Sequence, residues 1–337
     1  MIGDTGKKVI MARLSTKDKE KPFILIGAIF VGILLNRVIG GVMQEIYGLV
    51  NVGLFFVIFA IMTFVEIKDV GRAFTKVKPT ALALLTNFLI TPFFAWFLGW
   101  LFLRNYPDLW AGVILYKLTP CIGWYLIFID LADGDVPWGV SLLPWNLVLQ
   151  ILLLPVYLWL LVGKIVPIDA LLVIKSVGVF LFLPFIFGYI ARLLLIRWKG
   201  RKWTYGPFKN AMGEVKLWAL VFVIIGIFAS QGTIEVNDLG RIALIIFVIA
   251  IFFISLFLIG LAVGYKFRLG YKDTTTLIFT TTARNSEAVI GVAAAAFPGH
   301  PLVLFAILIG PVVELPVLVL LSRILLALRK QWKWEDI

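Results

Sequence analysis

Long apolar stretches separated by short polar connections run through most of this chain. Each stretch is long enough to cross about 30 Å of hydrocarbon, which takes about 20 helical residues. The pattern predicts an all-α polytopic membrane protein with ten transmembrane helices. Their approximate positions are 23–43, 48–66, 79–103, 109–131, 137–163, 167–196, 211–231, 240–264, 273–297 and 301–328. Residues 1–22 form a polar N-terminal arm and residues 329–337 a polar tail.

The composition supports a membrane protein and excludes several other classes. Hydrophobic residues make up 61% of the 337 residues, against roughly 45–50% in soluble domains. The net charge of +12 lies mainly in short connections, so we expect no nucleic-acid partner. One cysteine (Cys121) and one histidine (His300) cannot form a tetrahedral metal site, and no metal or cofactor is expected. No histidine cluster, Asp-rich motif or serine elbow suggests an enzyme.

The basic residues predict the orientation of the chain in the membrane. Lysines and arginines concentrate on one side of the predicted spans, with 23 in alternate connections and the two ends against four in the other connections. The side richer in basic residues is normally cytoplasmic. We therefore expect a multi-pass protein of the plasma membrane, the inner membrane in a bacterium, with both termini in the cytoplasm.

Two of the ten predicted spans are interrupted. The fourth contains Thr119-Pro120-Cys121 near its middle, and the ninth contains Arg284-Asn285-Ser286. A proline within a helix removes one backbone donor and breaks the hydrogen-bond ladder. Irregular backbone at membrane depth is tolerated where it is buried in protein or lines a cavity. The fourth and ninth spans are therefore predicted to be broken helices.

Spacing relates the two interrupted spans. Arg284, Pro301 and Glu314 follow Pro120, Pro137 and Gln150 by the same 164 residues. This offset predicts two five-span repeats, at 23–163 and 167–328. Because each repeat holds an odd number of spans, the second must run inverted relative to the first. Many secondary transporters have this arrangement, with a midplane site at the broken helices.

Ionisable residues at membrane depth mark the candidate site. Each costs about 2.5–3.5 kcal/mol to insert, so such groups usually face a cavity or each other. Arg284 and Glu287 are three residues apart, within reach for an ion pair, and Glu314 lies in the next span. One interpretation is a structural ion pair. The other is that Arg284, Glu287 and Glu314 couple ion movement to transport.

Uncharged polar side chains complete the candidate site. Cys121 offers a soft sulfur ligand, although a lone buried cysteine is often a small apolar filler. Asn285 occupies the repeat position equivalent to Cys121, so we expect the two to face each other. Amides at Asn87, Asn146 and Gln150 are predicted either to bind a small oxyacid or to cap neighbouring helices.

The ninth and tenth spans resemble those of a known family. The runs EAVIGVAAAAFPG (287–299) and FAILIGPVVELPVLVLL (305–321) are similar to the corresponding spans of the arsenical-resistance permeases, within the bile acid/sodium symporter superfamily. Thr119-Pro120-Cys121, the turn Gly134-Asp135, and residues 87–92 extend the resemblance. It implies that spans 3–5 and 8–10 form a core that moves against spans 1, 2, 6 and 7. It also implies efflux of arsenite or antimonite in exchange for protons, with functional roles for Cys121, Glu287 and Glu314.

This chain departs from the family pattern at two places. Residues 122–124 follow the cysteine where small polar residues are expected, and Arg284 stands where a neutral polar residue is expected. Lys117, one turn before Cys121, adds a second positive charge and is a candidate substrate contact. Fixed cations argue against sodium coupling and favour anions, so a carrier or symporter for an organic or inorganic anion is the alternative. The sequence does not indicate the oligomeric state.

Overall fold

A computed structural model describes residues 47–64, 75–122, 125–167, 169–230 and 239–331, together with part of 24–38. Over these ranges the chain forms helices, turns and a single isolated β-bridge. The predicted all-α class is confirmed. The N-terminal arm, much of the first predicted span and most of the tail lie outside the described residues.

The described α-helices are α3 (Tyr47–Met62), α5 (Val77–Leu85), α6 (Thr91–Leu103), α7 (Pro107–Leu118), α8 (Tyr125–Leu131), α9 (Val136–Tyr157), α10 (Ala170–Val177), α11 (Leu183–Lys199), α12 (Arg201–Trp203), α13 (Lys209–Ser230), α14 (Leu239–Lys266), α15 (Tyr271–Thr282), α16 (Ser286–Ala296) and α17 (Pro301–Gln331). Short π-helical segments are η3 (Thr86–Ile90), η4 (Leu158–Val162), η5 (Gly178–Phe182) and η6 (Thr204–Phe208).

Within the described ranges, five continuous helices are long and apolar enough to cross a membrane. They are Val77–Leu103, Val136–Val162, Leu171–Lys199, Gly240–Lys266 and Pro301–Arg329. The predicted span at 48–66 coincides with α3, which has 16 residues, and the spans at 109–131 and 273–297 each contain two shorter helices. A complete set of ten spans therefore stays a prediction.

Both predicted breaks are present, and they have the same local geometry. Thr119 follows α7 and Ala283 follows α15, and each adopts an extended conformation at the helix end. The chain then turns and begins a second helix, α8 at Tyr125 and α16 at Ser286. The two extended residues are 164 positions apart, the offset found in the sequence.

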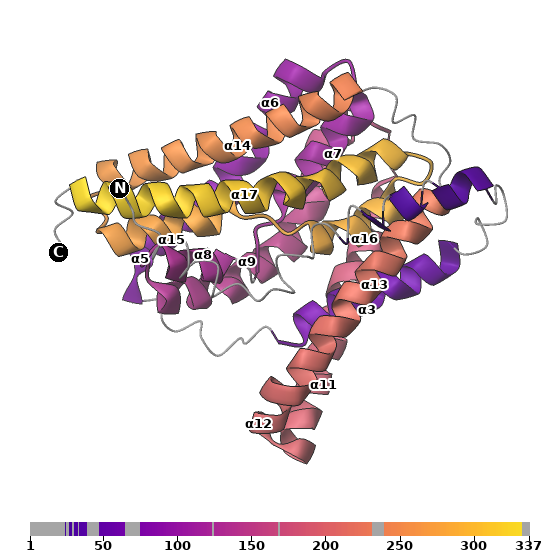
Figure 1. The fold of residues 1–337 in the computed structure, drawn as a ribbon, viewed down its shortest axis with the longest axis horizontal. Helices are drawn as coiled ribbons and strands as arrows, with labels where there is room; N and C mark the ends of the chain where they lie inside the picture. Colours follow the sequence, from indigo (N-terminus) through magenta and orange to yellow (C-terminus); the bar gives the residue numbers. More distant parts are fainter. Residues whose placement is uncertain are drawn as a thin grey trace.

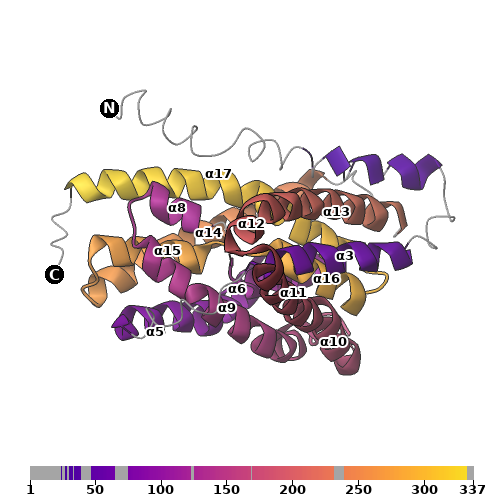
Figure 2. The same ribbon diagram turned by 90° about the horizontal axis from the view of Figure 1, so that it is seen from below.

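The described helices form two groups in space. α3 packs on both α13 and α11, and α11 projects from the rest of the molecule (Figure 1). In the other group α17 packs on α7 and α14, and α14 also packs on α15. Seen from below, α17 runs along most of the molecule's length (Figure 2). α16 contacts both α17 and α3, so it joins the two groups.

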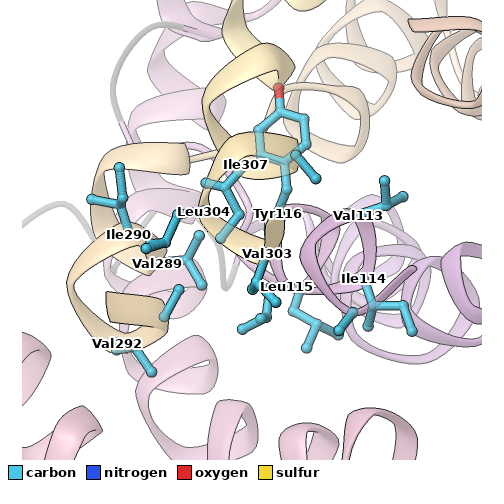
Figure 3. Packing of buried hydrophobic residues seen from close by; sticks show 14 of the residues in the cluster. Val113, Ile114, Leu115, Tyr116, Val289, Ile290, Val292, Val303, Leu304 and Ile307 are labelled. Atoms are coloured by element: carbon cyan, nitrogen blue, oxygen red, sulfur yellow. The ribbon is translucent and has the colours of Figure 1, made fainter. Parts of the chain in front are cut away.

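Buried apolar side chains fix α17 between α7 and α16. Val303, Leu304 and Ile307 of α17 lie between residues of α7 and α16 (Figure 3). The helices approach closely because Gly112 has no side chain, and a Cβ there would lie 2.4 Å from the Val303 carbonyl oxygen. This packing sets the position of α7 against α17.

Polar connections meet at one end of the molecule. The ammonium group of Lys76, ahead of α5, lies 2.8 Å from a carboxylate oxygen of Asp135 and also pairs with Asp273. Partial burial acts to lower the pKa of Lys76, but hydrogen bonds to the two carboxylates outweigh it and raise that pKa. Arg329 pairs with Asp133. These connections belong to the side predicted to be cytoplasmic, and their orientation toward the cytoplasm stays a prediction.

Candidate functional site

The two breaks cross and are joined through their backbones. The Cys121 N–H donates to the Ala283 carbonyl oxygen at 3.0 Å, and the Asn285 N–H donates to the Thr119 carbonyl oxygen at 2.9 Å. An antiparallel bridge pairs Pro120 with Arg284 between them. Cys121 and Asn285 are 164 positions apart, as are Thr119 and Ala283, so the repeat offset relates each of these two bonds to the other. The backbone thus pairs Cys121 with Ala283 and Asn285 with Thr119, and the prediction that Cys121 and Asn285 face each other across the crossing stays a prediction.

The guanidinium of Arg284 is buried and hydrogen-bonded to neutral oxygens. Its Nη1 donates to the Lys117 carbonyl at 3.1 Å, and Nη2 donates to Oδ1 of Asn87 at 3.1 Å. Two further donations reach the carbonyls of Thr281 and Thr282, the latter at 3.3 Å. The break of α15 exposes these last carbonyls, which have no partner within the helix.

The predicted ion pair between Arg284 and Glu287 is wrong. Glu287, in the first turn of α16, pairs at 3.0 Å with the ammonium group of Lys216 on α13. The guanidinium instead donates to carbonyls at the C-terminal ends of α7 and α15, which lack partners within their own helices. Glu287 consequently links the α3–α11–α13 group to the crossing.

Glu314 of α17 is part of the crossing. One carboxylate oxygen accepts the Arg284 backbone N–H at 2.8 Å, and the other accepts the hydroxyl of Tyr116. The Tyr116 ring reaches this carboxylate because it packs on Gly310, where a Cβ would lie 2.3 Å from the ring. Charge-assisted bonds of this kind are about twice as strong as neutral ones, so Glu314 anchors the second break to α17.

Amide groups form a hydrogen-bonded layer beside Arg284. Asn87 Nδ2 donates to the Asn146 side-chain oxygen at 3.3 Å and to the Thr280 carbonyl at 3.1 Å. Asn146 Nδ2 donates to Thr280 Oγ1 at 3.2 Å. Asn87 lies on the π-helical segment η3, just before Pro92. π-helical turns are frequent at functional sites, and this one brings Asn87 to the guanidinium.

Three predicted polar residues keep unsatisfied groups. Asn285 caps α16 by accepting the Ala288 N–H at 3.1 Å, which leaves its Nδ2 without a hydrogen-bond partner among the described residues. Both amide atoms of Gln150 and the ammonium of Lys117 also lack one within the described ranges. The Lys117 ammonium lies 3.8–4.3 Å from the centroids of three aromatic rings, those of Tyr116, Phe252 and Phe253. Gln150 and Asn285 have polar atoms to offer a ligand.

The Cys121 thiol is buried and not part of a disulfide. It belongs to an apolar cluster that includes Tyr125, Phe279 and Leu318. It also lies within electrostatic range of Arg284. The cysteine is therefore at the crossing, in an apolar cluster and close to the charged group.

Sequence reasoning missed three contributors to this site. Tyr116 and Lys216 were not assigned, although each bonds a predicted carboxylate. Six threonines among residues 274–282 were also left out, yet Thr280, Thr281 and Thr282 supply half of the oxygens that accept from the side chains of Asn87 and Arg284. Six hydroxyl side chains in one apolar span are a sequence feature that could have predicted these contacts. Within the described ranges no three His, Cys, Asp or Glu side chains gather to hold a metal ion.

Comparison with known proteins now identifies the family. The model of the Sodium Bile acid symporter family matches residues 51–238, more than half of the chain. The chain belongs to this family. The matched range includes the first break and the amide residues of α5–α9, and the chain is accordingly a membrane transporter of the sodium bile acid symporter family.

Relatives cover nearly the full length of this family member. The Arsenical-resistance protein Acr3 of Corynebacterium glutamicum is 26% identical over 95% of the chain and 91% of its own length. An uncharacterized transporter of Synechocystis is 27% identical over 96% of the chain and 92% of its own length. The Arsenical-resistance protein Acr3 of Alkaliphilus metalliredigens is 23% identical over 88% of both chains. The resemblance noted from the sequence is thus confirmed over most of the chain.

Proposed function

We propose that this transporter exports arsenite or antimonite from the cell in exchange for protons, with the substrate bound at the crossing of the two broken helices. The observation that carries the proposal is the position of the only cysteine: Cys121 lies at the backbone crossing, beside a break anchored by Glu314. Two relatives that cover most of the chain are named arsenical-resistance proteins. A thiol at this point suits a soft metalloid.

The proposed binding chemistry uses one sulfur bond. Arsenite at neutral pH is mainly the uncharged As(OH)₃. The Cys121 thiol condenses with it: an S–As bond forms, one As–O bond breaks, and the thiol proton leaves with that hydroxyl as water. Asn285 Nδ2 and the amide of Gln150, which have unused polar atoms, are proposed to bind the remaining hydroxyls. One sulfur bond is weaker than a chelate, which allows release.

The proposed proton carriers are Glu314 and Glu287. Glu287 pairs with Lys216 between α16 and α13, so protonating Glu287 releases a contact between the two helix groups. This supports coupling between protonation and movement of the α16 side against α3, α11 and α13. The proposal includes ten spans in two inverted repeats with both termini cytoplasmic, which the matched geometry of the two breaks favours.

An anion carrier is the less supported alternative. The Arg284 guanidinium already donates to four oxygens, and the Lys117 ammonium is enclosed by aromatic rings. Both positive groups are buried in these contacts, and neither is presented to an anion in the conformation described. A free anion must displace existing contacts to bind either group.

Uptake into everted membrane vesicles tests the proposal. Arsenite, antimonite and a set of organic anions are offered with either a proton or a sodium gradient imposed. We expect arsenite and antimonite to accumulate when the vesicle interior is acidic, and the sodium gradient to have no effect. Accumulation of an organic anion with no movement of arsenite contradicts the proposal and favours the alternative.

The role of the carboxylates is tested in the same vesicles. Glu287→Gln removes the titrating group while keeping its shape, and Lys216→Met removes its partner. We expect Glu287→Gln to abolish uptake driven by a pH gradient and to retain exchange of arsenite for arsenite, whereas Lys216→Met retains pH-driven uptake. Normal pH-driven uptake by Glu287→Gln assigns the proton to Glu314 and contradicts a proton role for Glu287.

A further inference from the structure

The contacts of Arg284 have the character of a cation-binding site. The guanidinium donates to three backbone carbonyls, those of Lys117, Thr281 and Thr282, and to the amide oxygen of Asn87. These acceptors come from three separate parts of the chain, α7, α15 and η3. They are neutral oxygens, the kind of ligand that also binds a free hard cation.

Helix ends explain why these oxygens require positive charge. Thr281 and Thr282 are the last two residues of α15, and Lys117 is the last but one of α7. The final carbonyls of a helix have no partner within it, and the C-terminal end carries a partial negative charge. Here two such ends converge in the buried crossing, where an unpaired polar group is costly.

The nearby carboxylate of Glu314 attracts the guanidinium electrostatically but accepts no hydrogen bond from it. Glu314 accepts the backbone N–H of Arg284 and the hydroxyl of Tyr116. The ring of Phe252 lies 5.7 Å from the guanidinium carbon and adds a further surface that favours a cation. The hydrogen bonds of the Arg284 side chain are therefore made to helix ends and an amide, while a ring and the carboxylate of Glu314 lie near its charge.

We propose that Arg284 is a tethered cation that permanently fills a binding site for a small monovalent cation at the converging ends of α7 and α15. In the natural chain the site is closed to ions in solution, which makes the fold independent of added sodium. Shortening residue 284 opens the site to a guanidinium-type cation and, more weakly, to an alkali cation. This inference concerns occupancy of the site and does not depend on the transported substrate.

Thermal unfolding of purified variants tests it. The Tm of Arg284→Ala is measured with methylguanidinium, sodium or tetramethylammonium, at concentrations well below those that denature proteins. Arg192→Ala is the matched control, because Arg192 is also buried but lies on α11, outside the crossing. Arg284→Lys is included because it keeps a tethered charge.

We expect methylguanidinium to raise the Tm of Arg284→Ala by an amount on the order of 3 °C and sodium to raise it less. Tetramethylammonium, which cannot donate hydrogen bonds, should have no effect. The natural chain and Arg192→Ala should not respond, and Arg284→Lys should respond less than Arg284→Ala. Folded Arg284→Ala with an unchanged Tm in all three salts overturns the inference, as does an equal response by Arg192→Ala.

If Arg284→Ala does not fold without an added cation, the yield of purified protein provides the test. Purification is then repeated with methylguanidinium present throughout. Monodisperse protein obtained only in its presence supports the inference, since the added cation restores what the mutation removed. Failure to recover protein under both conditions, when Arg284→Lys is recovered, shows that a free cation cannot fill the site and overturns the inference.

Discussion

The two breaks share one backbone geometry but carry different side chains. At the second break the Arg284 N–H donates to Glu314, and Tyr116 donates to the same carboxylate. At the first break the equivalent position is Pro120, which has no N–H, and the residue equivalent to Glu314 is Gln150, whose amide has no partner within the described ranges. The backbone crossing is symmetric, whereas the anchoring is not.

This difference separates what the fold requires from what the site uses. A helix end, an extended residue and two reciprocal backbone bonds are enough to build each break. The charged network is concentrated at the second break, which is bound to α17 through Glu314. The first break carries Cys121 and is free of that anchor. We infer that the second break is the rigid half of the crossing and the first is the adaptable half.

The largest effect should come from removing the anchor. Glu314→Ala leaves the Arg284 N–H and the Tyr116 hydroxyl without an acceptor in a buried site, at about 1–3 kcal/mol each. We expect a loss of about 4 kcal/mol in the free energy of unfolding, measured in mixed micelles. The equivalent change at the first break, Gln150→Ala, removes an unsatisfied amide and should stay within about 1 kcal/mol of the natural chain. Equal losses in the two variants contradict the asymmetry.

A second prediction concerns a substitution that displaces Tyr116 from Glu314. In Gly310→Ala the added methyl group meets the Tyr116 ring at 2.3 Å and must move it away from Glu314. We expect a loss of about 2 kcal/mol in unfolding free energy, the usual size for overpacking. Gly178→Ala is the control, because a Cβ there meets nothing within 4 Å, and it should be neutral or slightly stabilising. A neutral Gly310→Ala would mean that Tyr116 can shift without loss.

The third prediction compares the equivalent residues Cys121 and Asn285. Asn285→Ala removes the cap of α16 and should lower the unfolding free energy by about 1 kcal/mol, with arsenite export reduced in part. Cys121→Ser should retain stability within about 1 kcal/mol and lose export, because a hydroxyl is a poor ligand for a soft centre. Export is measured as arsenite resistance at equal protein levels. Full resistance in Cys121→Ser would make the thiol a packing residue.

The smallest expected effect concerns the missing bond at the first break. Pro120→Ala restores an N–H, and under the proposed inverted repeat the Gln150 side chain is placed to accept it. We expect Pro120→Ala to cost about 1 kcal/mol more in a Gln150→Leu background than in the natural one, the size of a typical hydrogen bond. A double-mutant cycle on unfolding free energy measures this coupling. Zero coupling would show that the two residues are not related as Arg284 and Glu314 are.

Much of the fold was predictable because lipid imposes simple rules. The lengths of the apolar stretches predicted the helices. Pro120 predicted the first break, and the polar cluster at Arg284 predicted the second. The 164-residue offset also predicted that the breaks correspond, which the reciprocal bonds between Cys121 and Ala283 and between Asn285 and Thr119 agree with.

The partners of charged residues were less predictable. The sequence favoured Arg284 pairing with Glu287, since three residues separate them along a helix. The break changes this, because it ends α15 and exposes carbonyls that attract the guanidinium. Glu287 instead pairs with Lys216, which lies 71 positions earlier in the chain. Such partners depend on how distant helices pack, and local spacing does not determine that.

The central claim, that Cys121 binds the substrate at the crossing, is tested most directly by labelling this thiol. Because the chain has one cysteine, the rate of maleimide labelling in membrane vesicles reports on Cys121 alone. We predict that labelling proceeds as the crossing opens, and that it slows about tenfold at an arsenite concentration ten times the Kd, since only unliganded thiol reacts. Organic anions should not protect. A labelling rate unaffected by arsenite, or a thiol that never reacts while arsenite is being transported, would contradict the account.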